Sequence, residues 1–143
     1  MKKIAFVALT LVLAMSLLAC GEAKPSTPAA PPTPPDLTGE WKQTDNASAD
    51  TWQVAKIEGD TIEVYWVSDN GDTQALYWAG SFTAPTTPDE PYTWDSQNDT
   101  AKTDMAILAS TDATKTFTYE AGVLSYQVSA MGATTTVKLE KQS

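Results

Sequence analysis

Two alternating segments, TIEVYWVSD (61–69) and TQALYWAGSFTA (73–84), flank the tetrapeptide DNGD (69–72) and decide the fold. In the first segment Ile62, Val64 and Trp66 recur at every second position, which is the period of a β strand. Asn-Gly between two such segments favours a type I′ turn, because both turn positions need a positive φ angle. The stretch 61–84 therefore predicts a β hairpin.

The same period of two recurs on both sides of this hairpin, and no segment has a convincing helical period. The links between segments are short, which favours antiparallel neighbours. One segment, 85–99, contains three prolines and predicts a long loop that carries Tyr92 and Trp94. The expected strands are 39–44, 51–59, 61–69, 73–84, 103–111, 115–122, 123–131 and 134–142.

Eight consecutive antiparallel strands predict an all-β fold, an eight-stranded up-and-down barrel that spans residues 37–143. Closure into a barrel also removes exposed strand edges. A sandwich of two sheets is the alternative, because the number of strands does not separate the two architectures.

The segment DLTGEW (36–41) resembles the Gly-x-Trp first strand of lipocalins and avidins, with Gly39 and Trp41 at the matching positions. The flanking Leu37-Thr38 is close to the avidin form. In those families the Trp plugs the base of an eight-stranded barrel, and the lipocalin fold implies a small apolar ligand. The resemblance covers about six residues, and it carries over no biotin-binding residue.

The N-terminus is typical of a secretory signal peptide, which we expect to span residues 1–19. Met1 is followed by two lysines and by the apolar run 4–19, which is shorter than the roughly 20 residues of a membrane-spanning helix. A helix that stays in the membrane uncleaved is the alternative.

The end of this run resembles the lipobox of bacterial lipoproteins, because it reads Leu17-Leu18-Ala19-Cys20. The resemblance implies that Cys20 receives a diacylglyceryl group and becomes the N-terminus after cleavage. Cys20 is the single cysteine of the chain and has no partner for an internal disulfide. An ordinary signal peptide with a chance or redox cysteine is the alternative.

Residues 20–36 combine the lipidated cysteine with a linker that contains six of the nine prolines. Proline has no N–H for a helix or sheet and favours the extended polyproline conformation. The composition predicts a semi-rigid spacer between the membrane and the barrel. A proline-rich ligand for a partner domain is the alternative, with Lys24 as its one flanking basic residue.

The composition excludes several classes of function. The formal net charge is −9, and loss of Lys2 and Lys3 with the signal peptide makes the mature chain more acidic. Such a chain repels phosphate backbones, so we expect no nucleic-acid partner. The absence of His and Arg removes His-dependent catalysis, the usual zinc sites and bidentate phosphate clamps. Many acidic residues are available to glycoside hydrolysis, but no pair is favoured. We therefore expect no enzyme, no cofactor and no metal site.

The candidate binding residues fall into two sets. Tyr92 and Trp94 in the 85–99 loop are amphipathic side chains of the kind enriched in binding sites, or else they cover one end of the barrel. The second set lines a ligand cavity or simply fills the core, and it consists of Trp52, Trp66, Trp78, Phe82, Phe117 and Tyr119. A calcium site at Asp69, Asn70 and Asp72, or at Asp95, Asn98 and Asp99, is a weaker alternative without the usual 12-residue loop.

These features together predict an extracytoplasmic lipoprotein, anchored to the membrane through Cys20, that presents a small acidic barrel as a binding module. A protein partner that binds the 85–99 loop is the first hypothesis. A carrier or sensor of a small apolar ligand in the barrel interior is the second. A third is the exclusion of superinfecting phage, a role known for small lipoproteins of prophages, which no residue here distinguishes.

Overall fold

The computed structural model describes residues 27–46, 48–130 and 132–143. The barrel lies in the compact unit Pro31–Ser143, and residues 27–36 form neither helix nor strand. Among the described residues, no helix is long and apolar enough to cross a membrane. The predicted signal peptide, the lipidation of Cys20 and the first part of the linker lie outside these residues.

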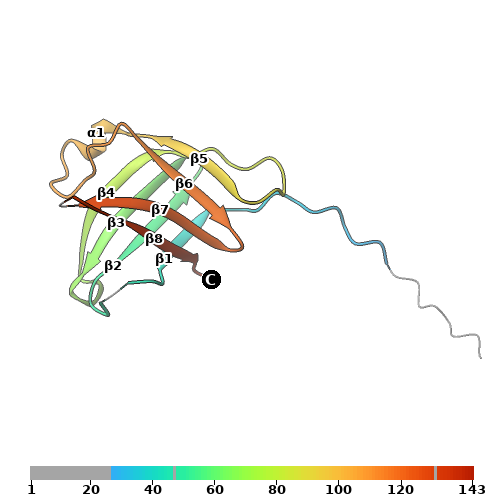
Figure 1. The fold of residues 1–143 in the computed structure, drawn as a ribbon, viewed down its shortest axis with the longest axis horizontal. Helices are drawn as coiled ribbons and strands as arrows, with labels where there is room; N and C mark the ends of the chain where they lie inside the picture. The colour runs from blue at the N-terminus through green and yellow to red at the C-terminus, as the bar shows by residue number, and fades with distance from the viewer. Residues whose placement is uncertain (1–26, 47, 131) are drawn as a thin grey trace, which may run out of the picture. The chain divides into compact units, whose positions relative to one another are not determined.

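Eight antiparallel strands form one sheet in the order β4-β3-β2-β1-β8-β7-β6-β5, curved into a nearly closed barrel (Figure 1). This confirms the predicted up-and-down barrel. A short helix α1 and a single 3₁₀ turn η1 are the other regular elements described. The bounds are β1 (Gly39–Gln43), β2 (Trp52–Glu58), β3 (Thr61–Ser68), η1 (Asp69–Gly71), β4 (Thr73–Ser81), β5 (Tyr92–Gln97), α1 (Thr100–Thr103), β6 (Thr114–Glu120), β7 (Val123–Ala130) and β8 (Ala133–Lys141).

The turn between β3 and β4 forms where the sequence predicts it. Asn70 and Gly71 have φ angles of 55° and 106°, and the Asp72 N–H donates to the Asp69 carbonyl at 3.2 Å. These are the features of a type I′ turn, in which both central residues have positive φ. The flanking strands pair from Thr61–Ser81 to Ser68–Thr73, with a register shift that leaves Tyr77 as an extra residue in β4.

The chain between β4 and β6 differs from the prediction. Residues 92–97 form strand β5 rather than part of a loop, and residues 103–111 form no strand. In β5 the buried Trp94 and Ser96 alternate with exposed residues, but this period of two is short and follows three prolines. In 103–111 the alternation of Met105 and Ile107 is present, but no neighbouring strand covers these side chains, which remain exposed.

The strand directions define two ends of the barrel. The entry end, where the chain enters β1 at Gly39, also holds the turns 59–60 and 121–122. The far end holds the turn 69–72, the segment 98–113, the end of β7 at Ala130 and the start of β8 at Ala133. Because β1 begins at one end and the β5–β6 connection lies at the other, the segment 98–113 is at the end of the barrel opposite Gly39.

A continuous hydrophobic core fills the barrel from the entry end. Trp41 is buried there, and its indole N–H donates to the Leu37 carbonyl at 2.9 Å. Aromatic rings contact one another across the interior, with Phe117 5.0 Å from Tyr126 and 5.3 Å from Trp94. The core cluster comprises Leu37, Trp41, Ala55, Ile57, Ile62, Val64, Tyr77, Trp78, Phe82, Trp94, Phe117, Leu124, Tyr126, Val128, Val137 and Leu139.

The barrel is least regular at the seam between β4 and β5. One isolated bridge, Gly80 with Asn98, joins the two strands there. Two side-chain hydrogen bonds reinforce the bridge, from the Trp78 indole N–H to Ser96 Oγ at 3.0 Å and from Gln97 N to Ser81 Oγ at 2.9 Å. These contacts close the sheet.

Candidate functional site

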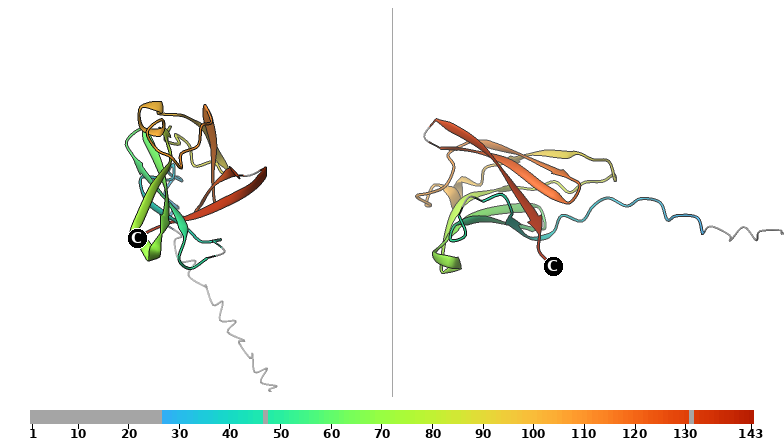
Figure 2. Two further views of the ribbon diagram at one scale, coloured as in Figure 1. Left: turned by 90° about the vertical axis from the view of Figure 1, so that its left-hand side faces the viewer. Right: turned by 60° about the horizontal axis from the view of Figure 1, so that its bottom comes forward.

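The far end of the barrel opens between β6 and β7. These strands pair only from Phe117–Tyr126 to Glu120–Val123, whereas β7 and β8 stay paired to Ala130 and Ala133. Figure 2 shows the β7–β8 hairpin diverging from the rest of the barrel. A cleft of about 490 Å³ lies in the divergence, lined by Asp112, Thr114, Lys115, Thr116, Thr118, Ser125, Tyr126, Gln127, Ser129 and Thr136.

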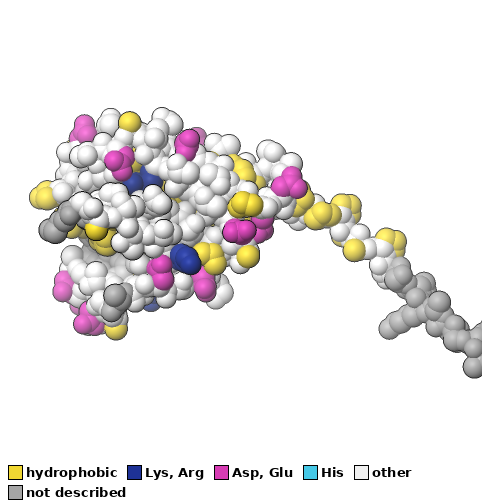
Figure 3. Space-filling model, viewed as in Figure 1, with side chains coloured by type: hydrophobic (Ala, Val, Ile, Leu, Met, Phe, Trp, Pro, Cys, Tyr) yellow, Lys and Arg dark blue, Asp and Glu magenta, His cyan; other side chains and the backbone are white. Residues whose placement is uncertain are grey.

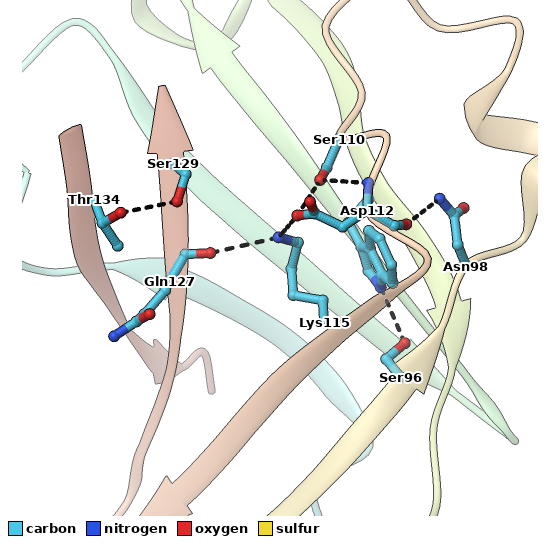
Figure 4. Close-up of polar contacts among 9 residues, drawn as sticks. Ser96, Asn98, Ser110, Asp112, Lys115, Gln127, Ser129 and Thr134 are labelled. Carbon is cyan, nitrogen blue, oxygen red and sulfur yellow. Dashed lines mark hydrogen bonds and ion pairs between the residues drawn. The ribbon is translucent and has the colours of Figure 1, made fainter. Parts of the chain in front are cut away.

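Lys115 is one of the residues that line this cleft, and Figure 4 shows its side chain between Asp112 and Gln127. It lies on β6 in the same alternation as the inward-facing Phe117, and it is only 6% exposed. Its ammonium group donates to Asp112 Oδ2 at 3.0 Å and to the Gln127 carbonyl at 3.5 Å, across the gap to β7. The ammonium group also lies 5.1 Å and 5.3 Å from the ring centroids of Tyr77 and Trp78. Such a charge is stable inside a protein because it is paired and solvated by aromatic faces.

Asp112 holds Lys115 from the segment that precedes β6. Hydrogen bonds from Ser110 and then from Lys115 lower the pKa of the Asp112 carboxyl below its usual value of 3.8. The Ser110 N–H donates to the Tyr77 carbonyl at 2.8 Å, so the segment is tied to β4. The Asn98 amide adds a hydrogen bond to the Asp112 carbonyl at 2.8 Å (Figure 4). The ion pair is thus built into the rim of the barrel.

A second hollow of about 420 Å³ adjoins the cleft at the far end and shares Asp112 and Ser129 with it. Its lining is more apolar and includes Trp66, Tyr77 and Leu108. At the far end of the barrel, the side chains that line the hollows are therefore mainly hydroxyl-bearing on β6 and β7 and aromatic on β3 and β4.

A buried polar pair lies among the inward-facing residues near this end. Gln53 and Tyr126 are both buried, and the Tyr126 hydroxyl contacts Gln53 Oε1. Burial raises the pKa of the Tyr126 hydroxyl well above its usual value of 10. Among the residues that the structure describes, Gln53 Nε2 is one of two buried side-chain nitrogens without a hydrogen-bond partner. The barrel interior is therefore apolar at the entry end and partly polar toward the far end.

The segment between α1 and β6 exposes three large apolar side chains. Met105 is 82%, Ile107 99% and Leu108 56% exposed, and they are the only large hydrophobic residues exposed among those described. We call residues 105–108 the apolar loop. In Figure 3 a hydrophobic side chain protrudes at the end of the barrel where this loop lies, and acidic side chains are spread over the visible face.

The six residues predicted to line an interior cavity divide into two groups. Trp78, Phe82 and Phe117 are buried in the core cluster, and Trp66 and Tyr119 pack against it. Trp52 is not part of it. It pairs with Val67 on the outer face of the barrel, and Lys42 Nζ lies 4.5 Å from its ring centroid. Trp78, Phe82, Phe117 and Tyr119 therefore belong to the packed interior, whereas Trp66 packs against the core and also lines the second hollow at the rim.

Tyr92 and Trp94 lie together but not on an exposed loop. Both belong to β5, and their rings stack at a centroid distance of 5.7 Å. Trp94 is 6% exposed and packs edge-on against Phe82 at 5.1 Å, while the Tyr92 hydroxyl donates to the Thr83 carbonyl at 2.6 Å. The predicted loop around Tyr92 and Trp94 is therefore wrong, and of the two alternatives for Trp94 the buried position favours a structural role, because the strand turns this side chain inward.

The two alternative calcium sites are not assembled. Asp69 accepts a hydrogen bond from the Thr73 hydroxyl at 2.7 Å, Asp95 from Thr116 at 2.6 Å, and Asn98 from Thr103 at 2.6 Å. In the described part of the chain, no group of three or more carboxylate, Cys or His side chains is placed to hold a metal ion.

Comparisons with protein families, with curated proteins and with solved structures give no match to this chain. Its site is therefore interpreted from its own geometry.

Sequence reasoning missed the residues of the far end. Lys115 lies two residues before Phe117 in the segment KTFTY, and side chains two residues apart on a strand face the same side of the sheet. The sequence could therefore have predicted that Lys115 points inward. The four-residue run MAIL at 105–108 belongs to the expected strand 103–111, although the Asp and Thr residues on both sides are typical of a loop.

Proposed function

We propose that this chain is an exported, lipid-anchored, non-enzymatic binding module that engages a protein partner with the far end of its barrel. The observation that carries the proposal is the apolar loop, with Met105, Ile107 and Leu108 exposed together. Burying such a side chain contributes about 1.5–3 kcal/mol, so a partner that covers all three gains several kcal/mol. Exposed apolar groups clustered on one loop mark interaction sites in soluble domains.

The position of the loop supports a protein partner over the membrane that carries the anchor. The lipobox resemblance places the lipid at Cys20, and the linker joins the barrel at the entry end. The apolar loop lies at the opposite end of the barrel. The acidic net charge of −9 also opposes approach to anionic lipid. A partner with an apolar pocket bordered by basic residues fits this surface.

The second hypothesis, a carrier of a small apolar molecule inside the barrel, has less support. The aromatic rings of the core touch one another across the interior, and the hollows described above lie at the rim. We therefore place the binding activity at the far end. The phage-exclusion role is one biological setting for such a partner, and no residue described here selects it.

The test is photocrosslinking in the intact cell envelope with a crosslinking amino acid at Ile107. The matched control carries it at Ala121, which is exposed in the turn at the entry end. We expect one discrete protein adduct at Ile107 and none at Ala121. The adduct is then identified, and its affinity is measured with the full lipoprotein.

The matching variant is M105S/I107S/L108S. We expect it to bind the identified partner at least about 100-fold more weakly, because loss of about 3 kcal/mol corresponds to that factor. Its thermal unfolding should stay close to that of the wild type, because the three side chains are exposed. Equal adducts at both positions, or an unchanged affinity, would contradict the proposal.

A further inference from the structure

The cleft between β6 and β7 exposes strand edges whose main-chain groups have no partner strand. The β6–β7 hairpin is closed by the two-residue turn Ala121-Gly122, so Glu120 and Val123 exchange main-chain hydrogen bonds. Hydrogen-bonded pairs recur at every second residue, and the next is Thr118 with Ser125. Further along, the N–H and C=O groups of Thr114 and Thr116 on β6, and of Gln127 and Ser129 on β7, point into the cleft.

The hydrogen bonding on the β5 side of β6 supports this assignment of the main-chain groups to the cleft. Asn98 N donates to the Ala113 carbonyl at 3.0 Å, on the β5 side. The groups of odd-numbered β6 residues therefore face β5, and those of even-numbered residues face β7. On the β1 side of β8, Thr44 N donates to the Lys138 carbonyl at 3.1 Å, so the main-chain groups of odd-numbered β8 residues face β7. Ser129 lies opposite the even-numbered Thr134, so its own main-chain groups face away from β8.

Of these main-chain groups, the Gln127 carbonyl accepts a hydrogen bond from a side chain of the cleft, and the others have no side-chain partner among the described residues. Most of the hydroxyls are paired with neighbouring strands, Thr116 with Asp95 at 2.6 Å, Thr118 with Thr93 at 3.1 Å, and Ser129 with Thr134 at 2.9 Å. Two side chains contact the facing main chain, both at long distances: Lys115 Nζ donates to the Gln127 carbonyl at 3.5 Å, and the Ser125 hydroxyl donates to the Thr118 carbonyl at 3.4 Å. Most of the other lining residues are Thr and Ser, whose small side chains leave the strand edges accessible.

We infer that the cleft binds an extended peptide segment of the protein partner, whose main chain pairs with the free edge of β7 at Gln127 and Ser129. Strand addition of this kind draws its affinity from main-chain hydrogen bonds. The inference rests on the proposed function, because the cleft meets the hollow lined by Leu108 of the apolar loop. A peptide on the β7 edge therefore continues toward the surface that the loop presents.

A pair of proline substitutions in one hairpin tests the inference. Ser129→Pro removes an N–H that faces the cleft and leaves the N–H groups of β7 that pair with β8. Thr134→Pro is the matched control, because it removes an N–H on the other edge of β8. Both substitutions break the same Ser129–Thr134 hydroxyl contact, so they differ mainly in the edge that they alter.

The probe is a phage-displayed library of random heptapeptides, panned against the full lipoprotein in detergent micelles and against empty micelles. We expect recovered peptides to bind the wild type and Thr134→Pro alike, and Ser129→Pro at least tenfold more weakly. N-methylation of alternate amides in the peptide should weaken binding by a similar factor.

Three results would overturn the inference. They are equal binding to Ser129→Pro, no peptide enriched over empty micelles, and a wild-type dimer in sedimentation that Ser129→Pro dissociates, which would make a second copy the occupant. The variant M105S/I107S/L108S separates this inference from the proposed function. If that variant loses the crosslinked partner while Ser129→Pro retains it, the cleft assignment fails and the docking function stands.

Discussion

Gly80 is the residue at which the two edges of the sheet come closest. A Cβ atom there would lie 2.4 Å from Ser96 Oγ, 2.5 Å from the Gln97 carbonyl and 2.7 Å from Trp78 Nε1. Two of these contacts are to strand β5, so the closure of the barrel depends on the missing side chain. The reason for glycine here is close packing between strands, because its φ angle is not in the left-handed region.

Gly80→Ala should therefore destabilise the barrel by about 1–3 kcal/mol or more, the usual cost of overpacking. Denaturant unfolding followed by tryptophan fluorescence measures the change. Gln74→Ala, at an exposed position of the same strand, is the control and should stay within about 0.5 kcal/mol of the wild type. If the two variants unfold alike, the strands do not meet at Gly80 as described.

Residue identity alone does not distinguish the tryptophans of the barrel. Trp52 lies on the outer face near Lys42, whereas Trp78 is buried against Ser96 and Lys115. The direction of each side chain follows from strand parity, which is readable from the sequence once the register is known. The register of β4 shifts at Tyr77, and no sequence pattern marked this extra residue.

Helix α1 illustrates an element that depends on tertiary contacts. Four residues are too few for a stable isolated helix. Lys102 Nζ on α1 reaches Glu63 Oε1 on β3 at 2.6 Å, and Asp99 N donates to the Ala79 carbonyl at 2.8 Å. These contacts hold α1, and with it the start of the segment that carries the apolar loop.

The ion pair of α1 predicts a dependence of stability on pH. Hydrogen bonds from Lys102 and then from Tyr65 lower the pKa of the Glu63 carboxyl in the folded state. A lowered folded pKa contributes stability that is complete above the unfolded value of 4.5 and is lost as pH falls through the folded value. Near neutral pH the free energy of unfolding of the wild type should therefore exceed that of the Glu63→Gln variant. We expect a difference of only roughly 0.5–1 kcal/mol, because the ion pair is partly exposed to solvent.

Chemical denaturation of both proteins across an acid pH series measures this difference. We expect it to shrink below about pH 4, where the carboxyl becomes protonated in both states. At alkaline pH, burial and the Glu63 carboxylate raise the pKa of Tyr65 to about 12. The protonated Tyr65 hydroxyl therefore contributes to the stability of the folded state below pH 10, and this contribution is lost as pH rises from 10 toward 12. A difference between the proteins that stays constant from neutral to acid pH would rule out this role for Glu63.

At the scale of the whole molecule, the proposed function assigns the membrane anchor to the N-terminal segment and the binding surface to the barrel. The anchoring prediction belongs to this scale. Stable attachment needs two acyl chains, because one chain gives only reversible binding. Replacing Cys20 with Ser should abolish incorporation of labelled palmitate and release the protein from the membrane fraction on cell fractionation.

A Cys20→Ser protein that stays membrane-bound to the same extent would contradict the lipid anchor. A wild-type protein that incorporates no palmitate would do the same. Serine preserves the size of the side chain, so export is expected to continue and the comparison isolates the thiol. The barrel should be unchanged in either case, because Cys20 precedes the compact unit that begins at Pro31.

The amino-acid sequence by itself determined the class of this protein's barrel, because alternation with period two and the Asn-Gly turn act over a few neighbouring residues. It also determined the candidate lipid site and the acidic charge, which depend on local pattern and composition. Only the tertiary structure decided which side of the barrel each aromatic ring faces, that 92–97 is a strand and that 103–111 is not. It alone decided that Lys115 and Asp112 meet beside a cleft. Burial depends on whether a distant strand covers a side chain, and a local pattern carries no information about that partner.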